Sequence, residues 1–333
     1  MFIRKLSRSL ALLAGVLVLV FSTLPAAAAT GSFGGDGLRI SPVRTSITIN
    51  PGQTKDVYVT VTNVQTAPAT LSAIINDFTA SSNESGNPAI IVNPNQYAPS
   101  HSLKRFVKPI KNTIYVAPGA SVQVPVSISV PANAAGGGYF GLVRFAPAGD
   151  SVSGRNLSLA GSVGSLILLT VPGNIINKMS ISSFQVQSQD APRTLFYSNK
   201  NLQAVVRFNN TGNIQEQPFG NLIVKSRSGK ELYSTEFNNT QPRTNVLPGS
   251  IRKYTIPLKK VGSFGIYTVE GNFGYGSNGQ LLTAATTFYV VPLYLIIAFI
   301  VLVLIVLFLI FGLPKIIKRY NKRIIARANR NRS

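Results

Sequence analysis

The sequence contains no cysteine and no tryptophan, and its only histidine is His101. Without cysteine the chain has neither disulfide bonds nor thiolate metal ligands, and one histidine excludes multi-histidine metal sites and a cysteine–histidine catalytic pair. Acidic residues are scarce as well, because 10 Asp and Glu stand against 32 Lys and Arg, a formal net charge of +22. We therefore predict a non-enzymatic protein without catalytic residues, bound metal or cofactor, whose fold depends on packing.

The first 29 residues have the pattern of a secretory signal peptide. Basic residues come first, an apolar run follows at 10–21, and alanine-rich residues at 24–29 offer small side chains for cleavage. The alternative is an uncleaved anchor, but twelve helical residues reach about 18 Å, less than the roughly 30 Å of a bilayer's hydrocarbon layer. We predict that residues 1–29 are removed.

A second apolar run, 293–313, contains no charged residue and lies between Pro292 and Pro314. As a helix it is about 31 Å long, which matches the hydrocarbon layer. The alternative is a buried helix of a soluble protein, but the rest of the chain has the pattern of strands and no need of such a helix. We predict one transmembrane helix at 293–313.

Eight cations and no acid follow this run, in residues 314–333. Basic segments beside a membrane helix stay on the cytoplasmic side, so we predict a single-pass cell-membrane protein with a cytoplasmic tail and all preceding domains outside. Contact with anionic lipid accounts for the tail, which makes membrane lipid a predicted partner and nucleic acid not one. The tail cations beside the membrane are Lys315, Lys318, Arg319, Lys322 and Arg323.

Between the apolar runs, apolar and polar residues alternate, most clearly at 55–62 and 121–130. A period of two is typical of antiparallel strands with one buried face, and no long stretch has helical periodicity, so the predicted fold class is all-β. The predicted strands are 38–43, 55–62, 70–78, 113–116, 121–130, 139–145 and 157–171, then 178–186, 201–208, 220–225, 231–237, 251–258, 265–273 and 280–290.

Turn signals divide these strands into two domains. Asn278-Gly279 predicts a tight hairpin. A new alternation of polar and apolar residues begins after residues 171–174, which marks the domain boundary. We predict two tandem immunoglobulin-like β-sandwiches, at 36–172 and 175–291, followed by the transmembrane α-helix. Proline presets φ and glycine accepts positive φ, so a turn into a strand is predicted at three proline–glycine pairs, namely Pro51-Gly52, Pro118-Gly119 and Pro248-Gly249.

Six short motifs follow one another along the chain: Ser41-Pro42, Pro51-Gly52-Gln53-Thr54, Val61-Thr62-Asn63, Pro118-Gly119, Gly136-Gly137-Gly138-Tyr139-Phe140-Gly141 and Asn209-Asn210-Thr211-Gly212-Asn213. Their order resembles the bacterial WxL-protein-interacting cell-surface family, over essentially the whole chain. The resemblance implies a surface-displayed adhesion or scaffold protein, with a first domain associated with peptidoglycan and a second associated with host or partner proteins. The chain departs from better-known members in lacking tryptophan and in its acid-poor ectodomain.

One segment of the predicted outer portion is strongly basic. Residues 104–111 hold four cations and no acid, a composition that attracts anionic polymers or lipid headgroups. The alternative is a solvated strand and loop in a basic protein. The candidate residues for binding an anionic polymer are Lys104, Arg105, Lys108 and Lys111.

Glycine and proline mark further strand features. Residues 136–138 are all glycine and open a strand rather than a helix, which favours a turn over a phosphate cradle. Pro125 and Pro257 interrupt good strands, so both strands are predicted at sheet edges. An edge can accept a partner's strand, but proline also prevents such pairing, and we favour this second interpretation.

Residues that catalysis often uses have structural explanations here. Ser250 and Lys253 have the spacing of penicillin-recognising enzymes, but they begin a strand, whereas that chemistry needs one helical turn between them. His101 lies between two serines, and we expect it in a solvated loop.

These features predict a membrane-anchored cell-surface protein that displays two β-sandwiches for binding envelope polymer, such as peptidoglycan or an anionic polymer, and another surface protein, as an adhesin or surface-assembly scaffold. No small-molecule substrate is expected. One alternative is a β-sandwich chaperone or secretion accessory that binds extended clients at a sheet edge. Another is a hydrolase or transpeptidase, which would require a nucleophile hydrogen-bonded to a base in a pocket.

Overall fold

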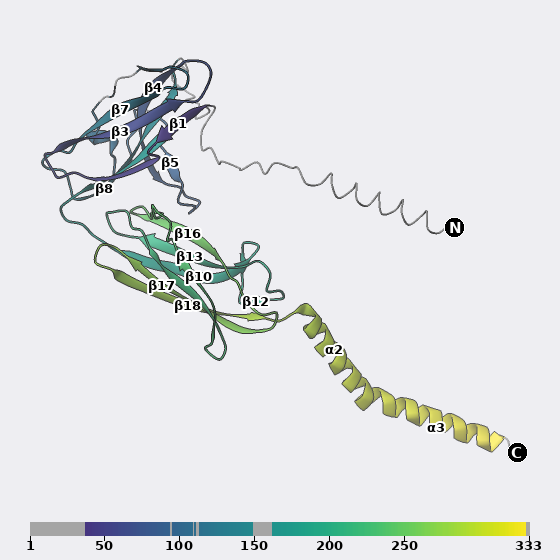
Figure 1. Ribbon diagram of the computed structural model, residues 1–333. Coiled ribbons are helices and arrows are strands. Elements are labelled where there is room, and N and C mark those ends of the chain that lie inside the picture. Colours follow the sequence, from purple (N-terminus) through teal and green to yellow (C-terminus); the bar gives the residue numbers. More distant parts are fainter. Residues whose placement is uncertain (1–36, 94, 109, 111–112, 149–161, 331–333) are drawn as a thin grey trace, which may run out of the picture.

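The computed structural model describes residues 37–93, 95–108, 110, 113–148 and 162–330, with side chains as far as residue 322. Figure 1 shows two β-structured modules followed by a long helical segment. The strands of the first module lie within residues 38–171 and those of the second module within residues 179–290. The predicted all-β fold class with one carboxy-terminal apolar helix is confirmed, and the predicted signal peptide lies outside the described residues.

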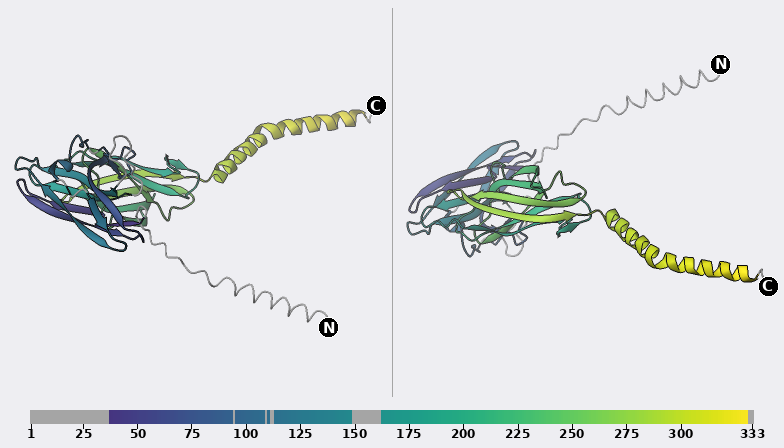
Figure 2. Two further views of the ribbon diagram at one scale, coloured as in Figure 1. Left: turned by 90° about the horizontal axis from the view of Figure 1, so that it is seen from above. Right: turned by 90° about the horizontal axis from the view of Figure 1, so that it is seen from below.

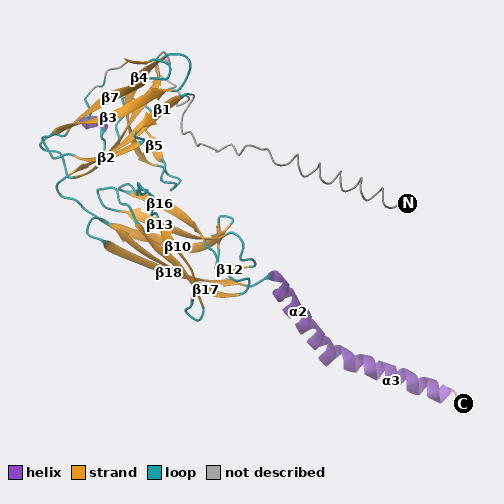
Figure 3. Ribbon diagram, in the orientation of Figure 1, coloured by secondary structure: helices purple, strands orange, loops and turns teal. Residues whose placement is uncertain are grey.

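The first module contains strands β1 Leu38–Ser41, β2 Arg44–Thr48, β3 Thr54–Asn63, β4 Ala69–Ala80, β5 Pro88–Ile90, β6 Thr113–Val116, β7 Ser121–Ser129, β8 Gly137–Pro147 and β9 Val163–Val171. They form two sheets (Figure 3), one ordered β1–β3–β7 and the other β2–β9–β8–β4–β5, with β6 paired to β4. Alternate residues such as Val59 and Val126 are fully buried and pack with Phe145 and Leu169 of the facing sheet. The predicted period of two is therefore confirmed.

The second module contains β10 Met179–Ser188, β11 Ala191–Pro192, β12 Leu195–Phe196, β13 Leu202–Asn210, β14 Phe219–Ser226, β15 Glu231–Phe237, β16 Ser250–Pro257, β17 Gly265–Tyr275 and β18 Gln280–Val290. One sheet has the order β11–β10–β13–β16 and the other β12–β18–β17–β14–β15. Aromatic rings fill the space between them: Phe208 lies edge-on to Phe273 at 5.1 Å between ring centroids, and Phe237 lies 4.9 Å from Tyr254. Such edge-to-face pairs stabilise beyond the area they bury.

A buried asparagine closes the end of one central strand in each module. Asn63 ends β3 and donates from Nδ2 to the carbonyl oxygens of Ala67 and Val116. Asn210 ends β13 and donates in the same way to Ile214 and Val246. Both side chains are fully buried, and each amide donates to two carbonyl groups, so that a buried polar side chain is satisfied. We call these two arrangements the asparagine clamps.

The proline–glycine turns meet the same strand ends. The backbone N–H of Gly119 donates to the carbonyl of Asn63 at 2.9 Å, and that of Gly249 donates to Asn210 at 2.8 Å. Gly52, Gly119 and Gly249 have φ angles of +80°, +69° and +66°, a region that glycine reaches without a steric cost. The three predicted turns are confirmed.

Two further strand predictions are confirmed. Among the described strands, β7 and β16 end their sheets, so Pro125 and Pro257 lie in edge strands. The Asn278-Gly279 hairpin joins β17 to β18, which pair from Gly265 opposite Val290 to Tyr275 opposite Gln280.

The predicted strand 38–43 is confirmed only at 38–41, where β1 lies, and the strand that follows it, β2 at 44–48, was not predicted. β1 pairs antiparallel with β3, whereas β2 pairs parallel with β9. Pro42 lies between them and has no N–H to continue a ladder. The short strands β5, β11 and β12 were not predicted, since two or three residues show no periodicity.

The carboxy-terminal segment is one continuous helical stretch, longer than the predicted span. It consists of α2 Leu293–Leu307, a wider π-type turn at Phe308–Gly312, and α3 Leu313–Arg330, with a bend between α2 and α3 that all views share (Figure 2). The helical backbone continues past Pro314, the residue that bounds the predicted span. Pro314 lacks the N–H that would reach back one turn, and the widened turn before it accommodates the lost hydrogen bond.

The stretch Leu293–Lys322 is long and apolar enough to cross a membrane, and its apolar part is not buried against the modules. The cations Lys315, Lys318, Arg319 and Lys322 lie on α3 and are exposed. The side chain of Arg323 lies outside the described residues.

Candidate functional site

The predicted basic segment lies on a short helical turn of the first module. Lys104 and Arg105 belong to a 3-10 turn, Lys104–Phe106, and the backbone N–H of Lys108 donates to Ser127 of β7. Phe106 packs against Tyr139 with 4.7 Å between ring centroids. Arg105 and Lys108 are exposed, whereas Lys111 lies outside the described residues. Packing of Phe106 therefore holds the segment in place, while the charged side chains remain exposed.

A buried carboxylate, which the sequence analysis missed, holds this segment. Asp77 at the end of the pairing between β4 and β8 accepts hydrogen bonds from the backbone N–H groups of Ala98 and Lys104, both at 2.9 Å, and from the hydroxyl of Ser102. The basic segment itself contains no acid, but in the folded structure the Asp77 carboxylate lies beneath its cations. The available signal was a single charged residue, Asp77, within the predicted strand 70–78.

The outer surface of the segment combines cations with an aromatic ring. Lys104 Nζ lies 4.8 Å and Arg105 Cζ lies 5.1 Å from the ring centroid of Tyr97, which is 46% exposed. Burial lowers the pKa of the Lys104 ammonium, and the Asp77 carboxylate acts in the opposite direction. Both cations therefore lie within the distance at which a cation is attracted to the face of an aromatic ring.

His101 is not solvated as expected. Its Nδ1 lies 2.6 Å from the carbonyl oxygen of Gly138, and its ring packs 5.9 Å from Phe140. The residue is half-buried with a φ of +58°. The backbone of Phe140 also donates to the carbonyl of His101, so the histidine attaches its loop to β8. The flanking serines suggested a polar loop, but they do not reveal that His101 contacts β8.

The glycine run and the Asn-Thr-Gly-Asn motif meet at the contact between the two modules. Asn213 donates from Nδ2 to the carbonyl of Gly136 at 3.0 Å, and its own carbonyl accepts from the N–H of Gly138 at 2.8 Å. A Cβ at Gly137 would lie 2.9 Å from the Asn213 carbonyl. The glycines thus permit two backbones to approach closely, whereas the sequence analysis predicted only a turn at this run.

A second contact between the modules involves the loop between β4 and β5. Glu84 accepts from Arg207 Nε at 2.6 Å, and its backbone carbonyl accepts from the N–H of Lys253 at 2.9 Å. A cavity of about 200 Å³ lies nearby, lined among others by Arg44 of the first module and Arg252 of the second. Burial, followed by the charge of Arg252, lowers the pKa of the Arg44 guanidinium. The modules are therefore held together by polar contacts at several points.

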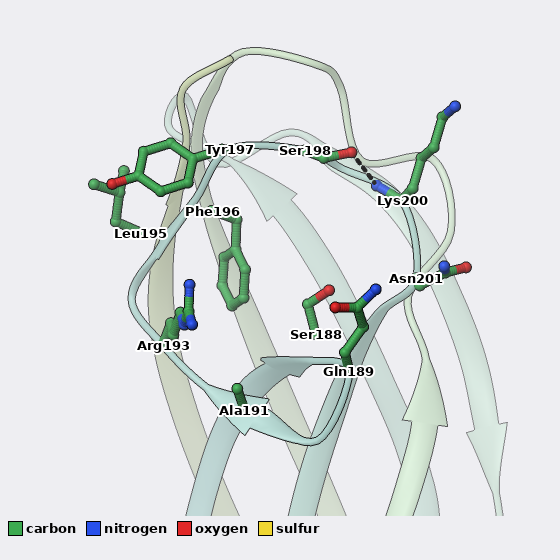
Figure 4. A pocket seen from close by; sticks show the side chains of 10 residues that line it. All are labelled: Ser188, Gln189, Ala191, Arg193, Leu195, Phe196, Tyr197, Ser198, Lys200 and Asn201. Carbon is green, nitrogen blue, oxygen red and sulfur yellow. Dashed lines mark hydrogen bonds between the residues drawn. The ribbon is translucent and has the colours of Figure 1, made fainter. Parts of the chain in front are cut away.

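The second module also has a hollow at its end nearest the helix (Figure 4). Ten residues line it, and Phe196 points into it while Lys200 points outward. The amide N–H of Lys200 donates to the hydroxyl of Ser198 at 3.2 Å. The lining contains no acid and no histidine, and the Lys200 side chain points away from the hydroxyl groups of Ser188 and Ser198.

The residues considered for catalysis belong to an ordinary β-strand. Ser250 begins β16 and donates to the carbonyl of Leu247 at 2.7 Å, and Lys253 lies in the same strand, opposite Arg207. Within the described part of the chain, no three His, Cys, Asp or Glu residues are grouped so as to hold a metal ion.

Comparisons with known proteins give a likeness in structure only. No family model matches the chain, and no curated protein matches it. Among solved structures, it is similar to the class 5 fimbriae chaperone CfaA, with 13% identity, a TM-score of 0.36, and coverage of 77% of this chain and 100% of that one.

Two further solved structures give the same picture. The CupB2 chaperone of Pseudomonas aeruginosa has 11% identity and a TM-score of 0.31, and covers 74% of this chain and 98% of its own. The CsuC–CsuE pre-assembly complex of Acinetobacter baumannii has 13% identity and a TM-score of 0.35, with 77% and 99% covered. At these values the function of this chain rests on its own residues.

Proposed function

We propose that the chain is a non-enzymatic, membrane-anchored surface protein that displays two β-sandwich modules outside the cell as an adhesin or surface-assembly scaffold. The observation that carries this proposal is the short connection between the second module and the apolar helix. Only Val291 and Pro292 separate the last strand of the second module from an apolar helix that the modules leave uncovered. A bilayer is the environment that such a helix favours.

The exposed Arg105 beside Tyr97 and the exposed Lys108 support binding of an anionic envelope polymer by the first module. The contact between the modules supports their display as one unit, with the second module nearer the membrane. In line with the resemblance to the WxL-protein-interacting family, we propose peptidoglycan or an associated polymer as the partner of the first module and another surface protein as the partner of the second.

The polymer site is tested with the full chain in detergent and purified anionic wall polymer. The double variant Arg105→Ser/Lys108→Ser is expected to weaken binding and to reduce its salt dependence, because exposed charges act over a distance that salt shortens. The matched control is Arg39→Ser/Lys55→Ser, which removes the same charge from exposed positions elsewhere in the first module. Equal binding by both double variants would contradict the site.

The chaperone alternative requires a sheet edge that accepts an extended client. Pro125 lies within edge strand β7 and Pro257 ends edge strand β16, and neither has an N–H for an added strand. An extended peptide that protects backbone amides of β7 or β16 from hydrogen exchange would support the chaperone function instead.

A further inference from the structure

The end of the second module nearest the helix presents an unusual combination of loops. Strand pairing brings them together: Gly265 lies opposite Val290, Ser226 opposite Tyr267, and Leu195 opposite Tyr289. The loops 189–201, 227–230 and 258–264 therefore all lie at the end where β18 leads into α2, close to β12 in Figure 1. We call this surface the helix-proximal end.

Large apolar side chains are exposed on this surface. Phe264 is 63% exposed, Tyr197 49% and Tyr289 44%. Phe264 and Tyr289 line a groove of about 860 Å³ together with Val291, the residue before the helix-leading proline. Exposed aromatic residues that gather at one place mark an interaction surface, and Trp, Tyr and Phe favour the interface between a bilayer and water.

The same surface is basic. Six exposed cations lie in its loops against two exposed acids, Asp190 and Glu231, which leaves a net charge of 6 − 2 = +4. An anionic lipid surface is the complementary partner for cations beside exposed aromatic rings. The six cations are Arg193, Lys200, Arg227, Lys230, Lys259 and Lys260.

The chain itself limits how far this surface can lie from a bilayer. Three residue steps from Val290 to Leu293 span at most about 11 Å, and Tyr294 is 65% exposed at the start of α2. The polar headgroup layer is about 5 to 8 Å thick on each side of the hydrocarbon. Phe264, which is next to the partner of Val290, is thus within reach of the headgroups when α2 enters the hydrocarbon.

We infer that the helix-proximal end rests on the anionic headgroups of the membrane, with Phe264 and Tyr289 inserted at the interface. This inference rests on the proposed anchoring by α2. It assigns the second module a membrane contact of its own, which fixes the height and tilt of both modules above the bilayer.

The absence of tryptophan from the chain allows a direct test with three single variants of the full chain in vesicles that contain anionic, brominated lipid. Phe264→Trp reports the helix-proximal end, Phe299→Trp reports the anchor, and Tyr58→Trp, 51% exposed on the first module, is the distant control. We expect quenching of the first two and not of the third. Quenching at Phe299→Trp without quenching at Phe264→Trp would overturn the inference alone, whereas loss of both would overturn the anchor.

Charge removal sharpens the test. In the Phe264→Trp background, Lys259→Ser/Lys260→Ser is expected to reduce quenching, since each cation near an anionic surface is worth about fivefold in the ratio of docked to undocked states. Arg39→Ser/Lys55→Ser removes the same charge from the first module and is expected to leave quenching unchanged. An equal effect of both double variants would contradict the inference.

Discussion

The two modules share one structural device and differ in how each buries its acid. Both end a central strand with an asparagine clamp that a proline–glycine turn completes. In the first module, the buried acid Asp77 accepts three hydrogen bonds from the loop that carries the basic segment. In the second module, the buried acid Glu216 leaves Oε1 without a hydrogen-bond partner. The asparagine clamp therefore has the same structural role in both modules. The buried acid differs, because it supports an exposed loop in the first module and has an unpaired oxygen in the second.

Glu216 lies at the side of the second module that faces the first. Its backbone pairs with Val246, and its side chain lines a cavity of about 500 Å³ together with Ser46 of the first module and Arg243. Burial raises the pKa of the Glu216 carboxyl to about 7, against a smaller opposing effect of the Gly276 N–H. The first module thus uses its acid to support an outward loop, and the second module places its acid at the module contact.

The largest expected effect is that of Asp77→Ala. It leaves three donors without their charged acceptor, so we expect the first module to lose about 4 kcal/mol of unfolding free energy. Urea unfolding of the full chain in detergent measures this, with Tyr58→Trp as reporter of the first module. The second module, reported by Phe264→Trp, should unfold as before, and an equal loss there would contradict the assignment of Asp77 to the first module alone.

The asparagine clamps should be equivalent. Asn63→Ala and Asn210→Ala each remove the amide from two carbonyl groups, and each is expected to cost its own module about 3 kcal/mol. The same two reporters measure the loss. Asn209→Ala, at the half-buried position next to Asn210 on β13, is the control and should cost about 0.5 kcal/mol, the usual scale for a substitution outside a buried hydrogen-bond network. A clamp variant as mild as this control would show that the devices are not equivalent.

Glu216 should make the second module sensitive to pH. Its folded-state pKa is about 7, above the ordinary value of 4.5, so the stabilising protonated form is present at low pH and lost as pH rises. We expect the unfolding free energy of the second module to fall by about 2 kcal/mol between pH 5 and pH 8. Glu216→Gln should remove this dependence and the exposed Glu231→Gln should retain it. A second module equally stable at both pH values would contradict the prediction.

The smallest expected effect concerns the ion pair between the modules. Arg207–Glu84 and Lys225–Glu270 have equal distances of 2.6 Å and similar exposure, so Glu84→Gln and Glu270→Gln should each cost about 0.5 kcal/mol. Only Glu84→Gln should speed hydrogen exchange at the N–H of Lys253, which donates to Glu84. Faster exchange in both variants would show that this contact is not specific to the module junction.

Much of the fold could be predicted because its signals are local. The period-two alternation predicted β3 and β7, two prolines predicted edge strands, and three glycines predicted turns with positive φ. Each of these follows from the geometry of a few neighbouring residues. The end of β1 at Ser41 and the separate strand β2 in the other sheet were missed, since the sheet that a strand joins depends on partners far along the chain.

The site was predicted less well for the same reason. The sequence indicated the cations of the basic segment, but not Asp77 beneath them or Tyr97 beside them, which fold onto the segment from elsewhere. It also predicted a turn at 136–138, whereas Gly137 and Gly138 belong to β8 and the run contacts Asn213 of the second module. Charge and composition are readable from the sequence, whereas the partners of a buried acid or a glycine require tertiary structure.

The most direct test of the central claim uses the absence of cysteine from the chain. Single cysteines are introduced at exposed positions on either side of the helix, as Ser277→Cys in the second module and Asn321→Cys in the tail, and intact cells are treated with a membrane-impermeant maleimide. We predict that Ser277→Cys is labelled in intact cells and that Asn321→Cys is labelled only after lysis. Labelling of Asn321→Cys in intact cells, with Ser277→Cys protected, would contradict the account.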